Sequence, residues 1–81
     1  MDKPSITITY CVPCDYLPRA LWQAAELLRP LAESVAGLTL VPGTGGVYEV
    51  ALGDTVLFSK AEQGRFPEVD ELVKAAFAQL G

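Results

Sequence analysis

The two cysteines of this chain lie close together in the stretch Tyr10-Cys11-Val12-Pro13-Cys14. Two thiols separated by two residues can form a disulfide across a tight turn, and a Cys-x-x-Cys between a strand and a helix is typical of thiol–disulfide exchange. That chemistry needs a thiolate nucleophile and a second thiol that resolves the mixed disulfide. We therefore predict that Cys11 and Cys14 form a redox-active catalytic pair.

The position of each cysteine suggests a role for it. Cys11 is expected at the end of a strand, just ahead of a helix whose unpaired N–H groups and dipole favour negative charge. Cys14 is expected to enter that helix and to be more shielded. We assign Cys11 as the exposed attacking thiol and Cys14 as the resolving thiol, and leave the reverse open. Asp15 disfavours a nearby thiolate, and Arg19 can pair with Asp15 and soften that effect.

Other interpretations of the cysteine pair stay open. A structural disulfide would close a very small loop, which restrains the unfolded chain only weakly. A tetrahedral metal site needs four ligands, and the chain has two cysteines and no histidine, so such a site would have to be shared by two chains. Two inert core cysteines are disfavoured by their place at the end of an element. Redox chemistry is the interpretation that we prefer.

The elements around the pair follow from the spacing of apolar residues. Residues 5–10 alternate between apolar and polar and predict a half-buried strand. A helix is predicted to begin near Asp15, with polar residues on one side and an apolar stripe at Leu17, Leu21, Ala24, Leu28, Leu31 and Val35. The predicted polar side carries Arg19, Gln23, Glu26 and Glu33. Pro30 removes a backbone hydrogen bond, and because the apolar stripe continues beyond it we expect a kink there, with Gly37 ending the helix.

The second half of the chain predicts three strands and a helix. The strands cover residues 38–41, 47–52 and 55–60, with a turn cluster over 42–46, whose glycines could let the backbone approach the dithiol. Gly53-Asp54 suits a two-residue hairpin turn of type II′. Residues 61–65 are predicted to form a polar loop, and the last helix is predicted to start at Pro67. Lys60, Arg65 and Phe66 could contact an acidic thiol such as glutathione.

This element order predicts a single domain over residues 1–81 with an α/β fold of the two-layer α+β kind. A mixed four-stranded sheet has the first strand in its centre, and both helices cover one face. The covered face is predicted to carry Ile6, Ile8, Tyr10, Leu38, Leu40, Tyr48, Val50, Leu52, Val56 and Phe58. The other face is open and mixed, which makes it a candidate partner surface.

Composition excludes several classes of function. The 81 residues carry a net charge of −4, and the six Lys and Arg residues are scattered, which argues against nucleic-acid binding. An apolar run long enough to span a membrane is absent from the sequence. The first residues lack the apolar core of a signal peptide, so we expect a cytoplasmic protein. Hydrophobic residues make up 51% of the chain, which favours a partner protein or a weak homodimer alongside a monomer.

Several segments taken together resemble the selenoprotein W-like Rdx family, the SelT/SelW/SelH group. The resemblance is carried by Ile8-Thr9-Tyr10-Cys11-x-x-Cys14, Arg19-Ala20, Ala25-Glu26-Leu27-Leu28, Leu40-Val41-Pro42-Gly43-x-Gly45-Gly46-Val47-Tyr48-Glu49-Val50 and Gly64-x-Phe66-Pro67-Glu68-Val69-x-Glu71-Leu72. It implies a thioredoxin-like fold without the helix that usually follows the second strand. It also implies a redox role often linked to glutathione, as a co-substrate rather than a bound cofactor. Cys14 matches the position that is often selenocysteine in the family, so the resemblance implies that Cys14 is the reactive residue.

Two functional hypotheses from different classes follow. The first is a thiol–disulfide oxidoreductase or redox-responsive protein that uses Cys11 and Cys14 on a thiol or disulfide substrate, either glutathione or a partner protein. The second is an interaction module whose cysteines regulate binding without turnover. A dimer bridged by a metal ion is a third and weaker hypothesis. Turnover of a disulfide substrate distinguishes the first from the second.

Overall fold

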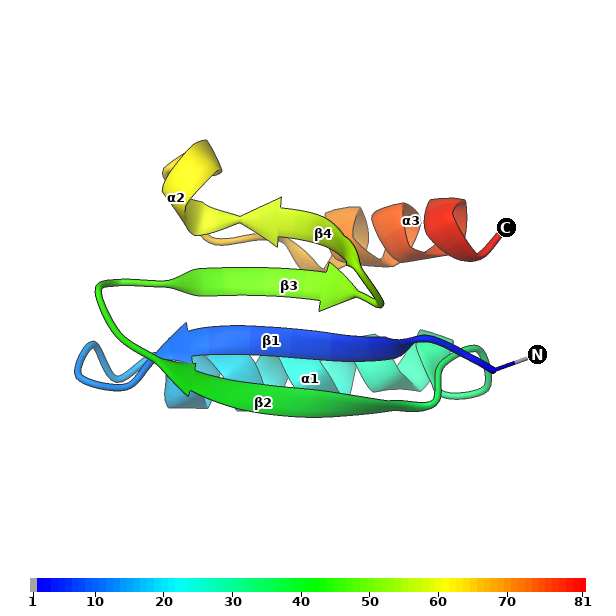
Figure 1. The fold of residues 1–81 in the computed structure, drawn as a ribbon, viewed down its shortest axis with the longest axis horizontal. Coiled ribbons are helices and arrows are strands. Elements are labelled where there is room, and N and C mark those ends of the chain that lie inside the picture. Colours follow the sequence, from blue (N-terminus) through cyan, green and yellow to red (C-terminus); the bar gives the residue numbers. More distant parts are fainter. Residues whose placement is uncertain (1) are drawn as a thin grey trace.

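The computed structural model describes residues 2–81, so Met1, which the predicted domain includes, lies outside the described residues. The described elements are β1 (Ser5–Cys11), α1 (Leu17–Leu31), β2 (Gly37–Gly43), β3 (Tyr48–Leu52), β4 (Thr55–Ser59), α2 (Lys60–Gln63) and α3 (Val69–Leu80). The strands form one sheet, and α1 and α3 cover the same face of it (Figure 1). This arrangement confirms the predicted two-layer α+β fold.

The sheet has the strand order β2-β1-β3-β4. β1 pairs in parallel with β2 and antiparallel with β3, and β4 completes an antiparallel hairpin with β3. The sheet is therefore mixed and β1 is central, as predicted, because the crossover through α1 returns the chain parallel to β1. The end of β1, the turn after β2 and the helix α2 all lie at one end of the molecule, opposite the two termini (Figure 1).

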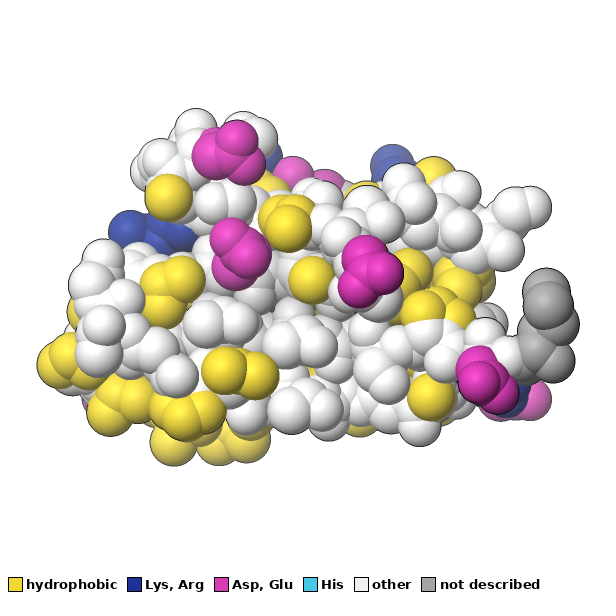
Figure 2. All heavy atoms as spheres, viewed as in Figure 1, with side chains coloured by type: hydrophobic (Ala, Val, Ile, Leu, Met, Phe, Trp, Pro, Cys, Tyr) yellow, Lys and Arg dark blue, Asp and Glu magenta, His cyan; other side chains and the backbone are white. Residues whose placement is uncertain are grey.

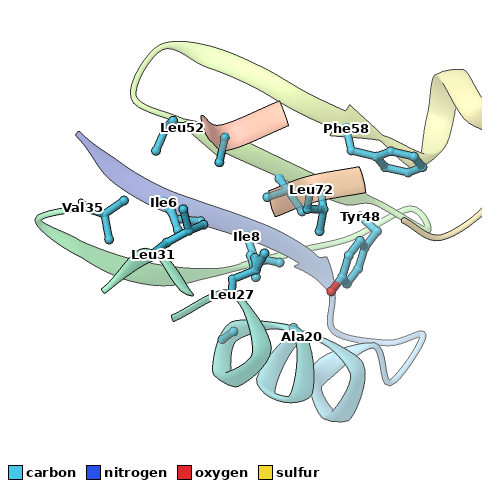
Figure 3. Packing of buried hydrophobic residues seen from close by; sticks show 13 residues of the cluster. Ile6, Ile8, Ala20, Leu27, Leu31, Val35, Tyr48, Leu52, Phe58 and Leu72 are labelled. Atoms are coloured by element: carbon cyan, nitrogen blue, oxygen red, sulfur yellow. The ribbon is translucent and has the colours of Figure 1, made fainter. Parts of the chain in front are cut away.

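The core lies between the sheet and the two long helices. Ile6 and Ile8 of β1 point towards Leu27 and Leu31 of α1, while Leu72 of α3 closes the other side (Figure 3). All five of these side chains are buried. Burial of each of these side chains contributes about 1.5–3 kcal/mol to the stability of the fold. The contacts between them hold α1 at a defined distance from β1.

The buried side of α1 differs from the prediction. The helix turns Ala20, Gln23, Ala24, Leu27 and Leu31 towards the core. Leu17 and Leu21, which were predicted to be buried, are exposed, and Gln23, which was predicted to be exposed, has no accessible surface. The apolar side of the helix is wider than the face that the sheet covers, so periodicity alone does not determine which part of that side is buried. The small side chains of Ala20 and Ala24 let the helix approach the sheet closely.

Both ends of α1 also differ from the prediction. The helix begins at Leu17 rather than near Asp15, which has a left-handed φ of 58°. It ends at Leu31, so the kink expected at Pro30 and the end expected at Gly37 are wrong. Pro30 cannot donate to the carbonyl four residues earlier, and only one more residue stays helical after it. Val35 nevertheless stays in the core because the turn after α1 folds it inwards.

The β3–β4 hairpin confirms the two predicted strands to within a residue at their ends. Gly53 has a φ of 58° in its two-residue turn, a conformation that glycine adopts without strain. An irregularity in the register pairs Val50 with Phe58 but Ala51 with Val56. This bulge moves Val56 off the covered face, so the prediction of a buried Val56 is wrong and its side chain is exposed.

The segment between β4 and α3 is more ordered than predicted. The polar loop expected over residues 61–65 contains the short helix α2, which ends at Gly64 with a φ of 72°. α3 starts at Val69 rather than at Pro67, and its first turn is closed by the Glu68 N–H, which donates to Oε2 of Glu71 at 2.7 Å. Carboxylates near a helix N-terminus are stabilising because they satisfy free N–H groups.

Candidate redox site

Cys11 and Cys14 form a disulfide, with their Cα atoms 5.3 Å apart. Cys11 is the last residue of β1, as predicted, and Cys14 lies in the loop that leads to α1. The pair therefore meets the first requirement of thiol–disulfide exchange, which is that the two sulfurs can bond to each other without rearrangement of the backbone.

Backbone hydrogen bonds hold the loop in shape. The N–H of Val12 donates to the carbonyl of Gly43 at 2.9 Å, and the N–H of Asp15 donates to the carbonyl of Val12 at 3.0 Å. The N–H of Tyr16 donates to the carbonyl of Cys11 at 3.2 Å. Asp15 has the left-handed conformation that closes this turn, and aspartate is among the residues that tolerate it best. The sulfurs are thus presented on a preformed turn attached to the central strand.

The exposure of the two cysteines is the reverse of the prediction. Cys11 is completely buried, whereas Cys14 is exposed. Cys14 does not enter α1, which begins three residues later, but lies on the outer side of the turn. Cys14 is therefore the cysteine of the disulfide that solvent reaches. The exposed position is also the one that matches selenocysteine in the resemblance described above.

Gly43 lies beside the dithiol because the parallel register pairs it with Cys11. A Cβ atom at this position would lie 2.8 Å from Cγ1 of Val47 and 3.3 Å from Cγ2 of Thr9. Only glycine fits this close approach without a shift of its neighbours. The backbone of the turn cluster does approach the dithiol, as its glycines suggested, and the carbonyl of Gly43 accepts the hydrogen bond from Val12.

Three aromatic rings form a cluster behind the loop. The rings of Tyr16, Tyr48 and Phe66 meet edge to face, with centroid separations of 4.9–6.2 Å. The guanidinium carbon of Arg19 lies 4.0 Å from the Phe66 centroid, and Nζ of Lys60 lies 5.5 Å from it. The sequence placed these residues in separate elements, and the fold brings them together next to the dithiol loop.

The predicted pairing of Arg19 with Asp15 is wrong. In the described part of the chain, the ion pairs are those of Arg29 with Glu26 and of Arg65 with Glu71. Arg19 packs on the Phe66 ring instead, because a guanidinium gains attraction from an aromatic face. Asp15, the neighbour of Cys14 in the chain, therefore has no ion-pair partner among the described residues.

A buried hydrogen-bond chain supports the aromatic cluster. The Tyr48 hydroxyl donates to Oε1 of Gln23 at 2.8 Å, and Nε2 of Gln23 donates to the carbonyl of Pro67 at 2.7 Å. Burial raises the pKa of Tyr48 to about 12, with a smaller opposing effect of the Arg19 charge. Sequence reasoning missed this chain because Gln23 looks like a surface residue and its partners lie 25 and 44 positions away.

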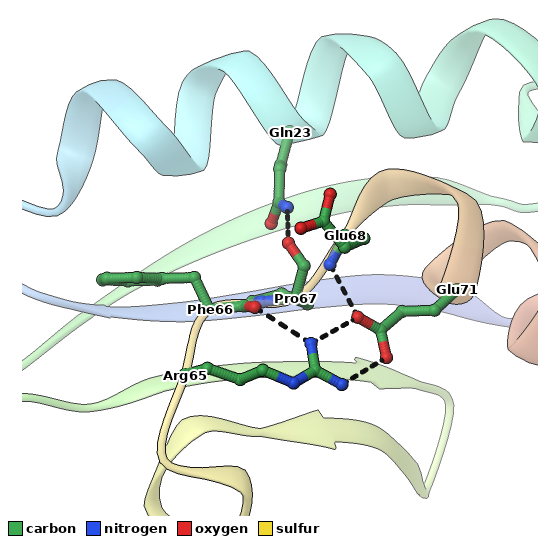
Figure 4. Close-up of polar contacts among 6 residues, drawn as sticks. All are labelled: Gln23, Arg65, Phe66, Pro67, Glu68 and Glu71. Carbon is green, nitrogen blue, oxygen red and sulfur yellow. Dashed lines mark hydrogen bonds and ion pairs between the residues drawn. The ribbon is translucent and has the colours of Figure 1, made fainter.

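Arg65 links the segment before α3 to the first turn of that helix. Its two terminal nitrogens donate to the two carboxylate oxygens of Glu71 at 2.7 and 3.0 Å, and one of them also donates to the carbonyl of Phe66 (Figure 4). The hydrogen bonds from Arg65 lower the pKa of Glu71 most, and the hydrogen bond from the Glu68 N–H lowers it further, to about 2. Of the three loop residues singled out in the sequence, Lys60 and Phe66 lie beside Tyr16, and Arg65 is engaged elsewhere.

Two further findings concern the described residues alone. Among residues 2–81, no group of three or more His, Cys, Asp or Glu side chains is placed to hold a metal ion. None of the helices in this part of the chain has the length and apolar character needed to cross a membrane.

Comparison with known proteins identifies the family. Residues 5–76 match the model of the Rdx family, and this chain belongs to that family. The structure superposes with a TM-score of 0.94 on a selenoprotein W-related protein from Vibrio cholerae, at 29% identity and covering 99% of this chain and 100% of that one. It superposes with a TM-score of 0.91 on a protein from Bordetella parapertussis, at 36% identity and covering 95% and 98% of the two chains.

The chain is also similar to two mammalian proteins. It is 31% identical over 72 residues to migration and invasion enhancer 1 from Bos taurus and from Mus musculus, covering 86% of this chain. The match spans 59% of each of those proteins, so this chain accounts for less than two thirds of the length of the curated relatives.

Proposed function

We propose that this protein carries out thiol–disulfide exchange, with Cys14 as the attacking residue and Cys11 as the resolving residue. The observation that carries the proposal is the pairing of a buried Cys11 with an exposed Cys14 in one disulfide. This assignment reverses the roles suggested by the sequence positions, and it agrees with the family resemblance. A redox role is supported by membership of the Rdx family and by the Cys-x-x-Cys pair.

The reduced protein transfers two electrons in two steps. The Cys14 thiolate attacks one sulfur of a substrate disulfide, forms a mixed disulfide and releases the other substrate sulfur as a thiolate that takes up a proton. Cys11 then loses its proton and attacks Sγ of Cys14, which releases the second substrate thiol and leaves the Cys11–Cys14 disulfide. A low-molecular-weight thiol such as glutathione returns the pair to the reduced state by the reverse exchange.

Three finer assignments belong to this proposal. The dithiol at the end of the central strand, ahead of the first helix, supports a thioredoxin-like assignment of the fold. Glutathione as a co-substrate and a cytoplasmic location are proposed with it, because a reducing compartment would keep such a pair able to cycle.

The test is thiol trapping in glutathione redox buffers, with intact-mass measurement of the wild type, Cys14→Ser and Cys11→Ala. We expect a reversible intramolecular disulfide in the wild type. Cys11→Ala should accumulate a glutathione mixed disulfide on Cys14, whereas Cys14→Ser should remain almost unmodified because Cys11 is buried. Thiols that stay reduced and unmodified over the whole range of buffers would refute the proposal.

The alternative, an interaction module without turnover, is favoured by one observation, the exposed apolar side chains near the dithiol. Repeated reduction of a small disulfide, with dithiothreitol as the electron source, separates the two functions. An exchange enzyme raises the rate of disulfide reduction above that of dithiothreitol alone in proportion to its concentration, whereas a regulated module leaves it at the rate of dithiothreitol alone.

A further inference from the structure

Large apolar side chains are exposed unevenly over this molecule. In residues 2–81 the exposed ones are Val12, Leu17, Leu21, Trp22, Val56 and Phe77. The first four, with exposures of 53%, 38%, 53% and 52%, lie within eleven residues that include Cys14. Hydrophobic side chains gather at the end of the molecule that holds the dithiol loop (Figure 2). We call the surface formed by Val12, Leu17, Leu21 and Trp22 the α1 apolar surface.

The α1 apolar surface starts at the disulfide. Val12 lies between the two cysteines, and Leu17 is the first residue of α1. Leu17 and Leu21 are four residues apart, so they lie one above the other on the helix. Trp22 follows about 100° further around the helix, so the surface wraps around part of α1. With a rise of about 1.5 Å per residue, the helical part extends only about 7.5 Å from Leu17 to Trp22. A bound segment of a few residues would therefore cover this surface and still place a sulfur beside Cys14.

One border of this surface is positively charged. Arg19 is three residues before Trp22, which makes the two side chains neighbours on the helix. Neither Arg19 nor Lys60 is paired with a carboxylate in the described part of the chain, although the chain carries more acidic than basic residues. Both cations lie over the Phe66 ring. Figure 2 shows Lys and Arg side chains beside α2 at this same end of the molecule.

We propose that the α1 apolar surface binds a cysteine-containing segment of a protein substrate, in which apolar side chains lie next to Asp or Glu. The apolar side chains cover Leu17, Leu21 and Trp22, and the carboxylates meet Arg19 and Lys60. This inference deepens the proposed function, because the bound segment supplies the disulfide that Cys14 attacks. The reaction is the two-electron exchange described above, and docking changes only how often the substrate sulfur reaches Cys14.

The test uses matched synthetic peptides, each with one cysteine activated as a pyridyl disulfide. Attack by Cys14 on the peptide sulfur releases pyridine-2-thione, which is followed by its absorbance. One peptide carries Leu and Glu residues around the cysteine, the second carries Leu and Lys, and the third carries Ser and Glu. Dithiodipyridine itself serves as the small substrate that cannot dock.

We expect the reduced wild type to react with the Leu/Glu peptide about tenfold faster than with the Ser/Glu peptide, the gain of burying one or two apolar side chains. It should also react faster with the Leu/Glu peptide than with the Leu/Lys peptide, because Arg19 and Lys60 attract carboxylates and repel ammonium groups. Leu21→Ser and Trp22→Ser should lose this preference, and Arg19→Glu should shift it towards the Leu/Lys peptide. Val56→Ser and Phe77→Ser are the matched controls, because these side chains are equally exposed elsewhere, and they should react like the wild type. Each peptide rate is divided by the same variant's rate with dithiodipyridine, so that a change in the reactivity of Cys14 itself is separated from a change in docking.

Equal rates with all three peptides would overturn the docking proposal while leaving the exchange reaction intact. If even dithiodipyridine fails to react, the proposed function fails. The docking proposal is then decided by fluorescence anisotropy, which measures binding of a fluorescent Leu/Glu peptide with Ser in place of its cysteine. A wild-type dimer that becomes monomeric in Leu21→Ser would show that a second copy covers the surface, which also overturns the proposal.

Discussion

Replacing Tyr48 by Phe should destabilise the protein at neutral pH and make it less sensitive to alkali. The change removes one hydroxyl from a fully enclosed ring that packs against Tyr16 and Phe66. Oε1 of Gln23 then loses its donor, while Nε2 of Gln23 keeps its bond to Pro67. An acceptor left without a partner in the interior costs about 1–3 kcal/mol, and we expect about 1.5 kcal/mol here.

The pH dependence follows from the raised pKa of Tyr48, which is about 12 in the folded state against 10.0 for an ordinary tyrosine. Between these values the folded state binds more protons than the unfolded state, so stability falls as the pH rises. The contribution is fully present below pH 10 and is lost as the pH rises through 12. At pH 11 the wild type has lost about 1.4 kcal/mol through this residue, the equivalent of one pKa unit.

Phenylalanine cannot ionise, so the variant lacks this loss. The stability difference between wild type and Tyr48→Phe should therefore shrink from about 1.5 kcal/mol at pH 7 to nearly zero at pH 11. Urea unfolding of the oxidised protein, followed by far-ultraviolet circular dichroism, measures both differences. Ile8→Val is the control, because it costs a similar 0.5–1.5 kcal/mol through roughly pH-independent packing. A Tyr48→Phe difference that stays the same at both pH values would refute the role given to the buried phenol.

Three further predictions concern the site and the helix that braces it. Asp15→Asn keeps the left-handed turn but removes a charge beside Cys14. Alkylation of reduced Cys14 at pH 7 should therefore become about twofold faster at low salt. A slower rate, or an effect that does not depend on salt, would contradict this prediction. Gly43→Ala places a methyl group 2.8 Å from Val47, so urea unfolding should show a loss of about 1–3 kcal/mol and altered amide shifts in the dithiol loop. Glu71→Gln removes a carboxylate whose pKa is lowered to about 2 in the folded protein. In acid titrations the wild type should therefore lose stability more steeply than the variant as the pH falls from 4.5 towards 2. Parallel acid curves would show that the Arg65 bridge contributes nothing.

Much of the architecture could be predicted from local patterns in the chain. Alternating residues over 5–10 predict β1, and Gly53-Asp54 predicts the β3–β4 hairpin, because a strand's period and a turn's backbone depend on neighbouring residues. The place of Cys11 at the end of β1 follows from the same pattern. The mixed sheet with β1 in its centre then follows from the handedness of the crossover. The family resemblance predicted Cys14 as the reactive residue, and Cys14 is the exposed cysteine of the pair.

The tertiary structure decided matters that depend on contacts between distant residues. The exact rotation of α1 was not determined by its periodicity, since the apolar side of the helix is wider than the face that the sheet covers. It was determined by how closely Ala20 and Ala24 allow it to approach the sheet and by the partners that Gln23 finds. That orientation leaves Leu17 and Leu21 exposed beside the dithiol.

The same division explains the chemistry of the site. The sequence alone determined that two thiols lie within bonding reach, because two intervening residues limit their separation. Which thiol faces the solvent was decided by the turn that Asp15 closes and by the hydrogen bond from Val12 to Gly43, a residue 31 positions along the chain from it. Burial depends on what the rest of the chain packs against each atom, and no local pattern records that.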